Sequence, residues 1–392
     1  MSGGGAGRPK FVVHAGMHKT GSSAVQAFCR KHPRVLKRLG IAYPRAFYQN
    51  HKFGTISLFM DEPAKPREDV SHRPRGYAPD DLKHAFDAFL ERAAKKRQHV
   101  LLSSETAVNL SPDGLRRLDE AAAPSFAPVE IVALLRPPLS FAQSASQQRL
   151  KGGMSLGRLE ERLPLPEYER RFEHMLAHFG PERLHLAPYH PSTLVGGDVF
   201  QTVVSLMGLD PAPAAAHRTE RRNTAMSLTA AKALSVFNAC IRENAITADV
   251  PASLAARFDD PVMHRFHDGF SISFQRHDTP MRLLLPVFTG ISGPPYRLTG
   301  TMMDNVTAAS RSDCEWLSRN FDIDIQAFDI APDEAVPAES LTTFEPDELA
   351  RIEAALDAFI ANAENTLLEL EEQTATPLSR ARKLFRAVTG IG

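Results

Sequence analysis

Short apolar runs alternate with amphipathic stretches along the first 210 residues. Four runs rich in aliphatic and β-branched residues predict buried strands at 10–15, 99–103, 129–135 and 183–188. Apolar positions at helical spacing predict helices between them, at 22–31, 82–96, 115–121 and 168–179. Strands that alternate with helices are typical of a parallel sheet covered on both faces, so the predicted fold class is α/β.

The pattern changes after residue 210. Helical spacing predicts two long helices, over 227–244 and 346–372, whereas 250–300 is rich in Pro, His and Arg and has weak periodicity. We therefore expect the chain to be organised in four parts. They are a flexible tail at 1–9, an α/β core at 10–210, a helical and irregular remainder at 211–376 packed on that core, and a basic amphipathic tail at 377–392.

Composition narrows the class of protein. The chain has 392 residues, of which 43% are hydrophobic, and its 46 Lys and Arg balance 46 Asp and Glu. A general nucleic-acid binder would carry a basic excess, so none is expected. Cys29, Cys240 and Cys314 form no C-x-x-C pair, which speaks against a disulfide framework or a zinc site and favours a reducing cytoplasm. No apolar stretch approaches the roughly 20 residues that span a bilayer, and none near the start has the length of a signal-peptide core.

The sharpest motif is GMHKTGSS at residues 16–23, which we call the phosphate loop. It follows a predicted strand and opens a predicted helix, where glycines expose backbone N–H groups beside the positive end of the helix dipole. Lys19 adds a charge, and the hydroxyls of Thr20, Ser22 and Ser23 add donors. The spacing resembles a Walker loop, but Ser22 and Ser23 follow Gly21 where that loop has Lys and Ser or Thr. The loop suits a phosphate and lacks the usual Mg-ATP arrangement.

A second anion-binding motif follows the strand predicted at 129–135. Arg136 stands at the carboxyl end of that strand, the edge at which open α/β sheets bind ligands, and its guanidinium suits a phosphate. Ser144 lies about two helical turns further on and can donate a hydrogen bond to the same group. The alternative is an ordinary surface Arg before a polar helix.

These motifs carry a family resemblance. KTGSS looks like the 5′-phosphosulfate loop of the sulfotransferases that use PAPS (3′-phosphoadenylyl sulfate), and HAGMHKTGSSAVQAF is similar to a bacterial branch of that family. LLRPPLSFAQSASQQ resembles the family's 3′-phosphate site, and TLVGGDVFQTVVSLMGLD and RRNTAMSL resemble later stretches, so the resemblance covers about residues 10–245. It implies a P-loop-like three-layer fold, PAPS as sulfuryl donor with PAP as product, and transfer to a hydroxyl of a small-molecule or glycan acceptor such as a carbohydrate or glycolipid.

The chemistry requires charge neutralisation on the sulfuryl group and a base for the acceptor proton. Lys19 is the expected electrostatic partner, and no metal is required if Lys19 and the loop amides do this work. Two residues are candidate bases. Glu105 follows the strand at 99–103, where many family members have a catalytic histidine; His51 lies in a loop and has an ordinary pKa near neutrality. The alternatives are a residue in the first turn of a helix for Glu105 and a solvated loop residue for His51.

Other residues carry weaker signals. Asn223 is a candidate cofactor contact, although a helix cap before Ser227 is the favoured interpretation. His264, His267 and His277 lack a metal-binding spacing. The basic tail at 378–391 could contact an anionic membrane surface weakly or, as we favour, dock on its own domain. Two rival functions remain open at this point, a P-loop kinase of a small metabolite and a non-catalytic nucleotide-binding module, and the oligomeric state is not indicated.

Overall fold

The computed structural model describes the residues 7–17, 19–45, 51, 55–61, 79–219, 225–242, 250–263 and 281–374. The predictions for Asn223, for His264, His267 and His277 and for the tail at 377–392 lie outside these residues.

The chain divides into two compact units. The first comprises Met1–Ala145, Leu165–Thr224 and Asp304–Ala331; the second comprises Ser146–Pro164, Ala225–Met303 and Pro332–Gly392. The sequence suggests a single boundary near residue 210, whereas the chain crosses between the units five times. In particular, the segment 304–331 returns to the first unit after much of the second has been built.

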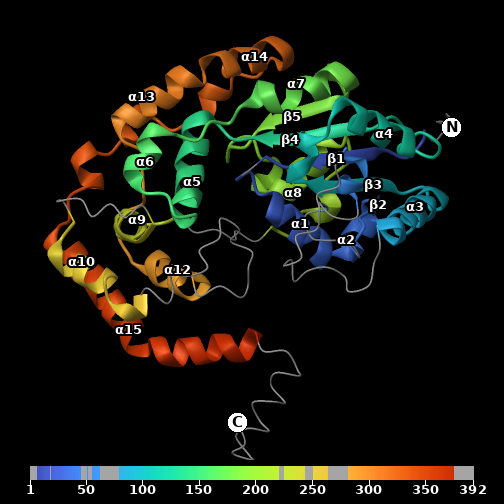
Figure 1. Ribbon diagram of the computed structural model, residues 1–392. Coiled ribbons are helices and arrows are strands. Elements are labelled where there is room, and N and C mark those ends of the chain that lie inside the picture. Colours follow the sequence, from blue (N-terminus) through green and yellow to red (C-terminus); the bar gives the residue numbers. More distant parts are fainter. Residues whose placement is uncertain are drawn as a thin grey trace, which may run out of the picture. The chain divides into compact units, whose positions relative to one another are not determined.

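The first unit is built on a parallel sheet of five strands (Figure 1). The strands are β1 (Phe11–Ala15), β2 (Ile41–Ala42), β3 (His99–Ser104), β4 (Glu130–Leu135) and β5 (Leu184–Pro188). Their order across the sheet is β2-β3-β1-β4-β5, and all four pairings are parallel. The predicted α/β class is confirmed, together with the four predicted strands; β2 was not expected from the sequence.

Helices cover both faces of this sheet, because side chains along each strand alternate between two cores. Phe11 and Val13 of β1 join the core under α3, α4, α7 and α14, while Val12 joins the core under α1, α2 and α8. These helices are α1 (Ser22–Lys31), α2 (Pro33–Arg38), α3 (Pro79–Lys95), α4 (Pro112–Ala122), α7 (Tyr168–Phe179), α8 (Val199–Leu206) and α14 (Arg311–Phe321). The first unit is therefore a three-layer arrangement with helices on either side of the sheet.

The second unit is helical. It contains α6 (Leu156–Glu161), α9 (Leu228–Arg242), α10 (Ala252–Phe258), α12 (Met281–Gly290) and α15 (Pro346–Thr374). The two long helices predicted after residue 210 correspond to α9 and α15. Their buried faces are joined by an ion pair between Lys232 and Glu348, and Thr229 donates a hydrogen bond of 2.9 Å to the same carboxylate. Two helices, α5 (Pro138–Lys151) and α13 (Gly300–Ala309), contain residues of both units.

Within the described residues, no helix is both long and apolar enough to cross a membrane.

Candidate active site

The phosphate loop leaves the sheet at its central strand. β1 ends at Ala15, and the backbone N–H of Gly16 donates to the carbonyl of Ser104 at 3.3 Å, which ties the start of the loop to the end of β3. A Cβ atom at Gly16 would lie 2.7 Å from the side chain of Ser22, closer than such atoms approach. The loop therefore folds back tightly on the first residue of α1, and this close approach requires glycine at its first position.

The backbone of the phosphate loop is left-handed on either side of Thr20. Lys19 and Gly21 have positive φ values of 68° and 82°, on either side of Thr20, an alternation that turns successive backbone N–H groups inward as an anion-binding nest. No side chain caps α1 at Gly21, and the first turn has no acidic residue. The first N–H groups of a helix have no partner within it, and they carry the positive end of its dipole. This part of the chain can bind a phosphate or sulfate.

The loop hydroxyls are not equivalent. Thr20 is buried and donates to the carbonyl of Met17 at 2.7 Å, so its hydroxyl stabilises the loop itself. Ser22 is also buried, and its hydroxyl lies 3.0 Å from a carboxylate oxygen of Glu105. Ser23 is exposed. Of the three expected hydroxyl donors, Ser23 is thus the one on the surface, and the other two fix the loop.

Arg136 connects the second motif to the first. It follows β4, which pairs with β1, and its Nη1 donates to the carbonyl oxygen of Lys19 at 2.6 Å. Its Nε donates to the hydroxyl of Ser140 at 2.9 Å, and the guanidinium lies 5.7 Å from the centre of the Tyr189 ring. Burial lowers the pKa of Arg136, which the nearby tyrosine and a carboxylate oppose. A charge held partly out of water in this way acts more strongly on an anion than an exposed one.

The helix that carries Ser144 is fixed at its beginning by a distant carboxylate. Asp329 accepts hydrogen bonds from the backbone N–H groups of Leu139 at 2.8 Å and Ser140 at 2.9 Å. Burial raises the pKa of Asp329, and these two N–H groups and Arg136 lower it. Ser144 is half-buried one turn beyond Ser140, and residues four apart share a helix face. The direct side-chain partner of Arg136 is therefore Ser140, with Ser144 further along the same face.

Sequence reasoning missed Ser140 and Asp329. Ser140 had a usable signal, because it is four residues after Arg136 in a segment already predicted to enter a helix. Asp329 had none, since it lies 190 residues from Leu139 in the chain and no local pattern pairs the two.

Glu105 lies at the same edge of the sheet as the phosphate loop. It is the first residue after β3, in a short 3₁₀ helix (Glu105–Asn109), and it is half-buried. The contact with Ser22 places its carboxylate beside the start of α1. The expected proximity of Glu105 to the loop is thus observed, and its role as a base remains a prediction.

His51 differs from expectation. Its side chain is fully buried, its Nδ1 accepts a hydrogen bond of 3.0 Å from the backbone N–H of Ser103, and its ring lies 4.3 Å from that of Tyr43. Burial lowers the pKa of His51 to about 3, an effect that hydrogen bonding to the Pro44 backbone opposes. The alternative of a solvated loop residue was wrong, because the ring is enclosed, and the role of His51 as a base remains a prediction that its lowered pKa disfavours. A neutral imidazole whose Nδ1 lone pair is engaged is a poor base.

A second buried histidine was missed altogether. His14 of β1 has its Nδ1 2.9 Å from the hydroxyl of Ser103, and Gln26 of α1 donates to the Ser103 carbonyl at 3.3 Å. Burial lowers the pKa of His14 to about 4, an effect that the charge of Glu105 opposes. Ser103, two residues before Glu105, therefore contacts three buried polar side chains, those of His14, Gln26 and His51. His14 went unnoticed because it stands inside an apolar run that reads as strand.

Comparisons with protein-family models, with curated proteins and with solved structures find no match for this chain.

Proposed function

We propose that this protein is a sulfotransferase that transfers a sulfuryl group from PAPS to a hydroxyl of an acceptor. The observation that carries the proposal is the hydrogen bond between Arg136 and the Lys19 carbonyl, which joins two anion-binding motifs 117 residues apart in the chain. A donor with phosphate at both ends of a ribose needs two such sites side by side. One isolated glycine turn or one surface arginine would not provide them.

The strand order supports a nucleotide site of the P-loop-like kind. β1 lies in the middle of the sheet, with β3 on one side and β4 on the other. Ligands of open α/β sheets bind outside the carboxyl ends of the strands, where neighbouring connections leave in different directions. The phosphate loop, Glu105 and Arg136 follow β1, β3 and β4, so all three belong to that edge.

Each residue has a defined task in the proposed reaction. The loop N–H groups and the Lys19 ammonium stabilise the negative charge that develops between the sulfuryl group and the phosphate it leaves. Arg136 and Ser144 bind the 3′-phosphate. The acceptor oxygen forms a bond to sulfur in line with the breaking sulfur–oxygen bond, and PAP departs with that electron pair. Glu105 accepts the proton of the acceptor hydroxyl.

The favoured acceptor class is a carbohydrate or glycolipid, as the resemblance in residues 10–245 implies. A kinase acting on a small metabolite is the second candidate, and it is disfavoured because Ser22 stands where a Walker loop has the lysine that follows its last glycine. A nucleotide-binding module without chemistry is the third.

Calorimetric titration separates these candidates. A sulfotransferase is expected to bind PAP in the presence of EDTA and to transfer label from [³⁵S]PAPS to a panel of hydroxyl acceptors. A kinase would bind ATP with Mg²⁺ more tightly than PAP. Failure to bind PAP in the presence of EDTA would contradict the proposal, and so would tighter binding of ATP with Mg²⁺. PAP binding with no transfer to any acceptor, including water, would favour the non-catalytic module.

A further inference from the structure

A pocket of about 450 Å³ lies beside the edge strand β2, within the first unit and away from the site described above. We call it the β2-edge pocket. Its lining residues are Pro33, Leu36, Lys37, Ile41, Tyr43, Arg45, Lys96 and Gln98. None of them belongs to the phosphate loop or to the segment around Arg136, and β2 is separated from β1 by β3.

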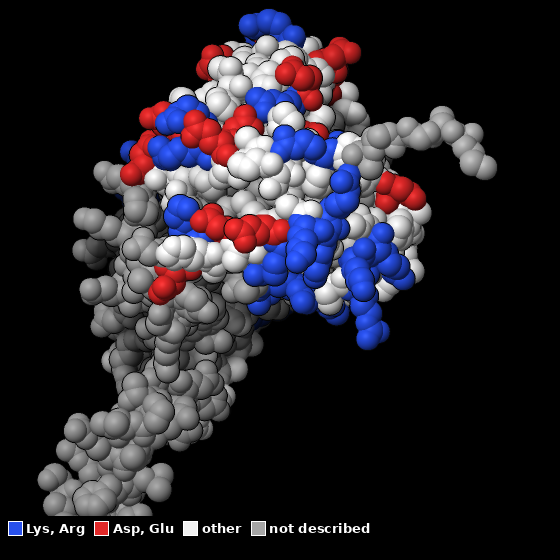
Figure 2. Space-filling model, turned by 90° about the vertical axis from the view of Figure 1, so that its right-hand side faces the viewer, with Lys and Arg blue, Asp and Glu red and all other residues white. Residues whose placement is uncertain are grey.

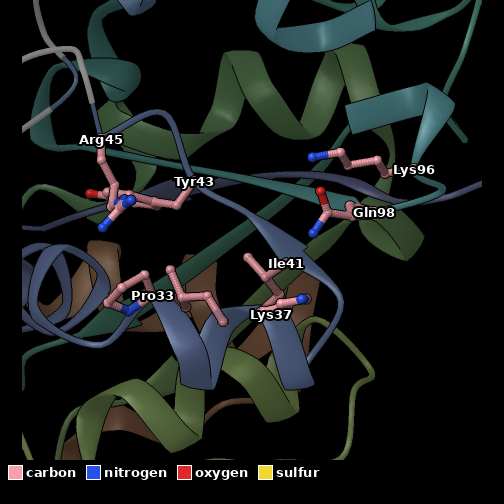
Figure 3. Close-up of a pocket in the computed structure, with 8 residues that line it drawn as sticks. Pro33, Lys37, Ile41, Tyr43, Arg45, Lys96 and Gln98 are labelled. Carbon is pink, nitrogen blue, oxygen red and sulfur yellow. The ribbon is translucent and has the colours of Figure 1, made fainter. Parts of the chain in front are cut away.

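Three cations reach this pocket from three different parts of the chain (Figure 3). Lys37 comes from α2, Arg45 follows β2, and Lys96 lies between α3 and β3. In Figure 3 the side chains of Lys96 and Gln98 extend towards the space over Ile41, while Arg45 lies beside Tyr43. All three cationic residues are exposed. The polar side chains among the lining residues are these three cations, the Gln98 amide and the Tyr43 phenol, and none of them is acidic.

The base of the pocket is apolar. Leu36 and Ile41 line it and are only 3% and 2% exposed, so they do not project from the surface. An apolar base with a few polar groups around it is the usual make-up of a site for a small organic molecule, and the volume falls within the roughly 300–1,000 Å³ typical of such sites. A membrane surface would instead require exposed apolar side chains that protrude.

The charge around the pocket is one-sided in a chain whose formal net charge is zero. The first 60 residues contain no Asp or Glu, and the stretch from Arg92 to His99 adds four cations and no acid. On the face that Figure 2 displays, one dense group of Lys and Arg side chains has few acidic side chains among it, whereas basic and acidic side chains are interspersed elsewhere on that face. The local potential therefore favours an anion, whereas the balanced total charge does not favour a long polyanion.

We propose that the β2-edge pocket binds a small molecule that carries a phosphate or sulfate ester on a compact apolar or ring-shaped body. The ester group contacts Lys37, Lys96 and Arg45, and the body covers Leu36 and Ile41. This binding requires nothing of PAPS or of sulfuryl transfer. The pocket has a structural route to the candidate active site, because the Tyr43 ring contacts His51, which accepts a hydrogen bond from Ser103.

The test uses phenyl phosphate and phenyl sulfate as probes, titrated calorimetrically at constant ionic strength. The titrations use the full chain with Lys19→Ala, so that the phosphate loop contributes little to binding, and the wild-type chain is titrated in parallel for comparison. We expect both esters to bind more tightly than inorganic phosphate or sulfate, because the ring adds apolar contact. Lys37→Gln and Lys96→Gln should each weaken binding about threefold to tenfold, the range for a partly exposed charged contact.

Arg34→Gln is the matched control. Arg34 is exposed on the same helix as Lys37 and does not line the pocket. Its substitution by Gln removes the same charge as Lys37→Gln. Equal weakening by Arg34→Gln and Lys37→Gln would show a diffuse charge effect and overturn the proposal, as would binding no tighter than that of the inorganic ions. Binding that occurs only when Lys19 is present would assign the esters to the phosphate loop and also overturn it. None of these outcomes alters the PAP titration in EDTA, which tests the sulfotransferase separately.

Discussion

The hydroxyl of Ser22 donates a hydrogen bond of 3.0 Å to Oε1 of Glu105. The contact joins the first residue of α1 to the first residue after β3, 83 residues further along the chain. A serine hydroxyl has one proton to donate, so in this arrangement Ser22 positions the carboxylate and does not donate to a bound phosphate. The acidic group is thereby held at the mouth of the phosphate loop.

Glu105→Gln tests the proposed base. The amide oxygen can still accept the hydrogen bond from Ser22, but the side chain cannot take a proton. Turnover is expected to fall by about a hundredfold or more, the usual contribution of a general base, while PAP affinity stays within about twofold. Steady-state kinetics with PAPS and calorimetry with PAP provide the two readouts. Ser22→Ala, which keeps the carboxylate and removes its partner, should cause a smaller fall; unchanged turnover in Glu105→Gln would show that the proton leaves by another route.

Lys19→Ala tests the electrostatic role of the phosphate loop. The loss of a charge aimed at the transition state should reduce turnover by about a hundredfold or more, with the thermal unfolding midpoint little changed. The backbone at this position has φ of 68°, so Lys19→Gly is a useful second variant that removes the charge without strain. Activity within threefold of wild type in both variants would contradict the assignment.

Arg136 and Ser144 are expected to recognise the phosphate that PAP has and adenylyl sulfate lacks. Arg136→Ala should cost about 1.5–3 kcal/mol of PAP binding, the range for a charged hydrogen bond. Because Arg136 also holds the Lys19 carbonyl, adenylyl sulfate should weaken too, though less. Ser144→Ala leaves that contact intact and should weaken PAP alone, by about 0.5–1.5 kcal/mol. Equal losses of affinity for the two ligands in both variants would show that the 3′-phosphate does not bind at this site.

Two carboxylates of the returning segment 304–331 offer a matched pair. Asp329 caps α5, and Asp313 accepts hydrogen bonds from the N–H groups of Tyr168 and Glu169 at the start of α7. Replacing either with Ala should lower the free energy of unfolding by about 1–2 kcal/mol, as for other lost helix caps. Only Asp329→Ala should also weaken PAP binding, since it releases the helix that carries Ser140 and Ser144. Urea denaturation and calorimetry on both variants check this, and equal PAP affinity in the two would leave Asp329 with a purely structural role.

The pH dependence of stability should reveal His51. Its pKa in the folded chain, about 3, lies below the ordinary value of 6.5, so the unfolded chain takes up the proton first as pH falls. Stability from this residue is complete above pH 6.5 and decreases as pH falls through the window towards 3. Between pH 6.5 and 5 this amounts to about 2 kcal/mol.

His51→Asn isolates that effect, because the Asn side-chain oxygen can still accept from the Ser103 N–H. The wild-type protein should lose about 2 kcal/mol more than the variant between pH 6.5 and 5, measured by urea denaturation at each pH. His14 contributes alike to both proteins and cancels. Identical pH profiles would mean that the imidazole is protonated in the folded chain as easily as in the unfolded one.

The strands and the loop were accessible from the sequence because their signals are local. A β-branched run followed by glycines and a helical pattern specifies β1, the phosphate loop and α1 without reference to any other part of the chain. β2 was not accessible, since two residues, Ile41 and Ala42, are too short to show alternation. α2 had a signal in Pro33 at its first turn, but six residues give little periodicity.

The partners of the site residues were harder to predict. Glu105 could be placed near the loop from its position after a strand, whereas the environment of His51 could not. Its pKa depends on enclosure by Tyr43 and Ser103, which approach it through the tertiary fold. The same holds for Asp329, which is 189 residues from Ser140 in the chain and reaches its backbone N–H only through the tertiary fold. The sequence pattern thus predicted the residues that could bind an anion, but not Ser140 and Asp329, which fix Arg136 and the start of α5.

The return of residues 304–331 to the first unit has a consequence for biosynthesis. When a ribosome has synthesised the whole sheet, the N-terminal ends of α5 and α7 still lack Asp329 and Asp313, which arrive only after most of the second unit has been translated. More than a hundred further residues must therefore be translated after β5 before Asp313 and Asp329 can cap these helix ends. A fragment that stops shortly after β5, although it contains every strand of the sheet that the structure describes, would emerge with the backbone N–H groups at the starts of α5 and α7 uncapped, and chaperones would be expected to bind it.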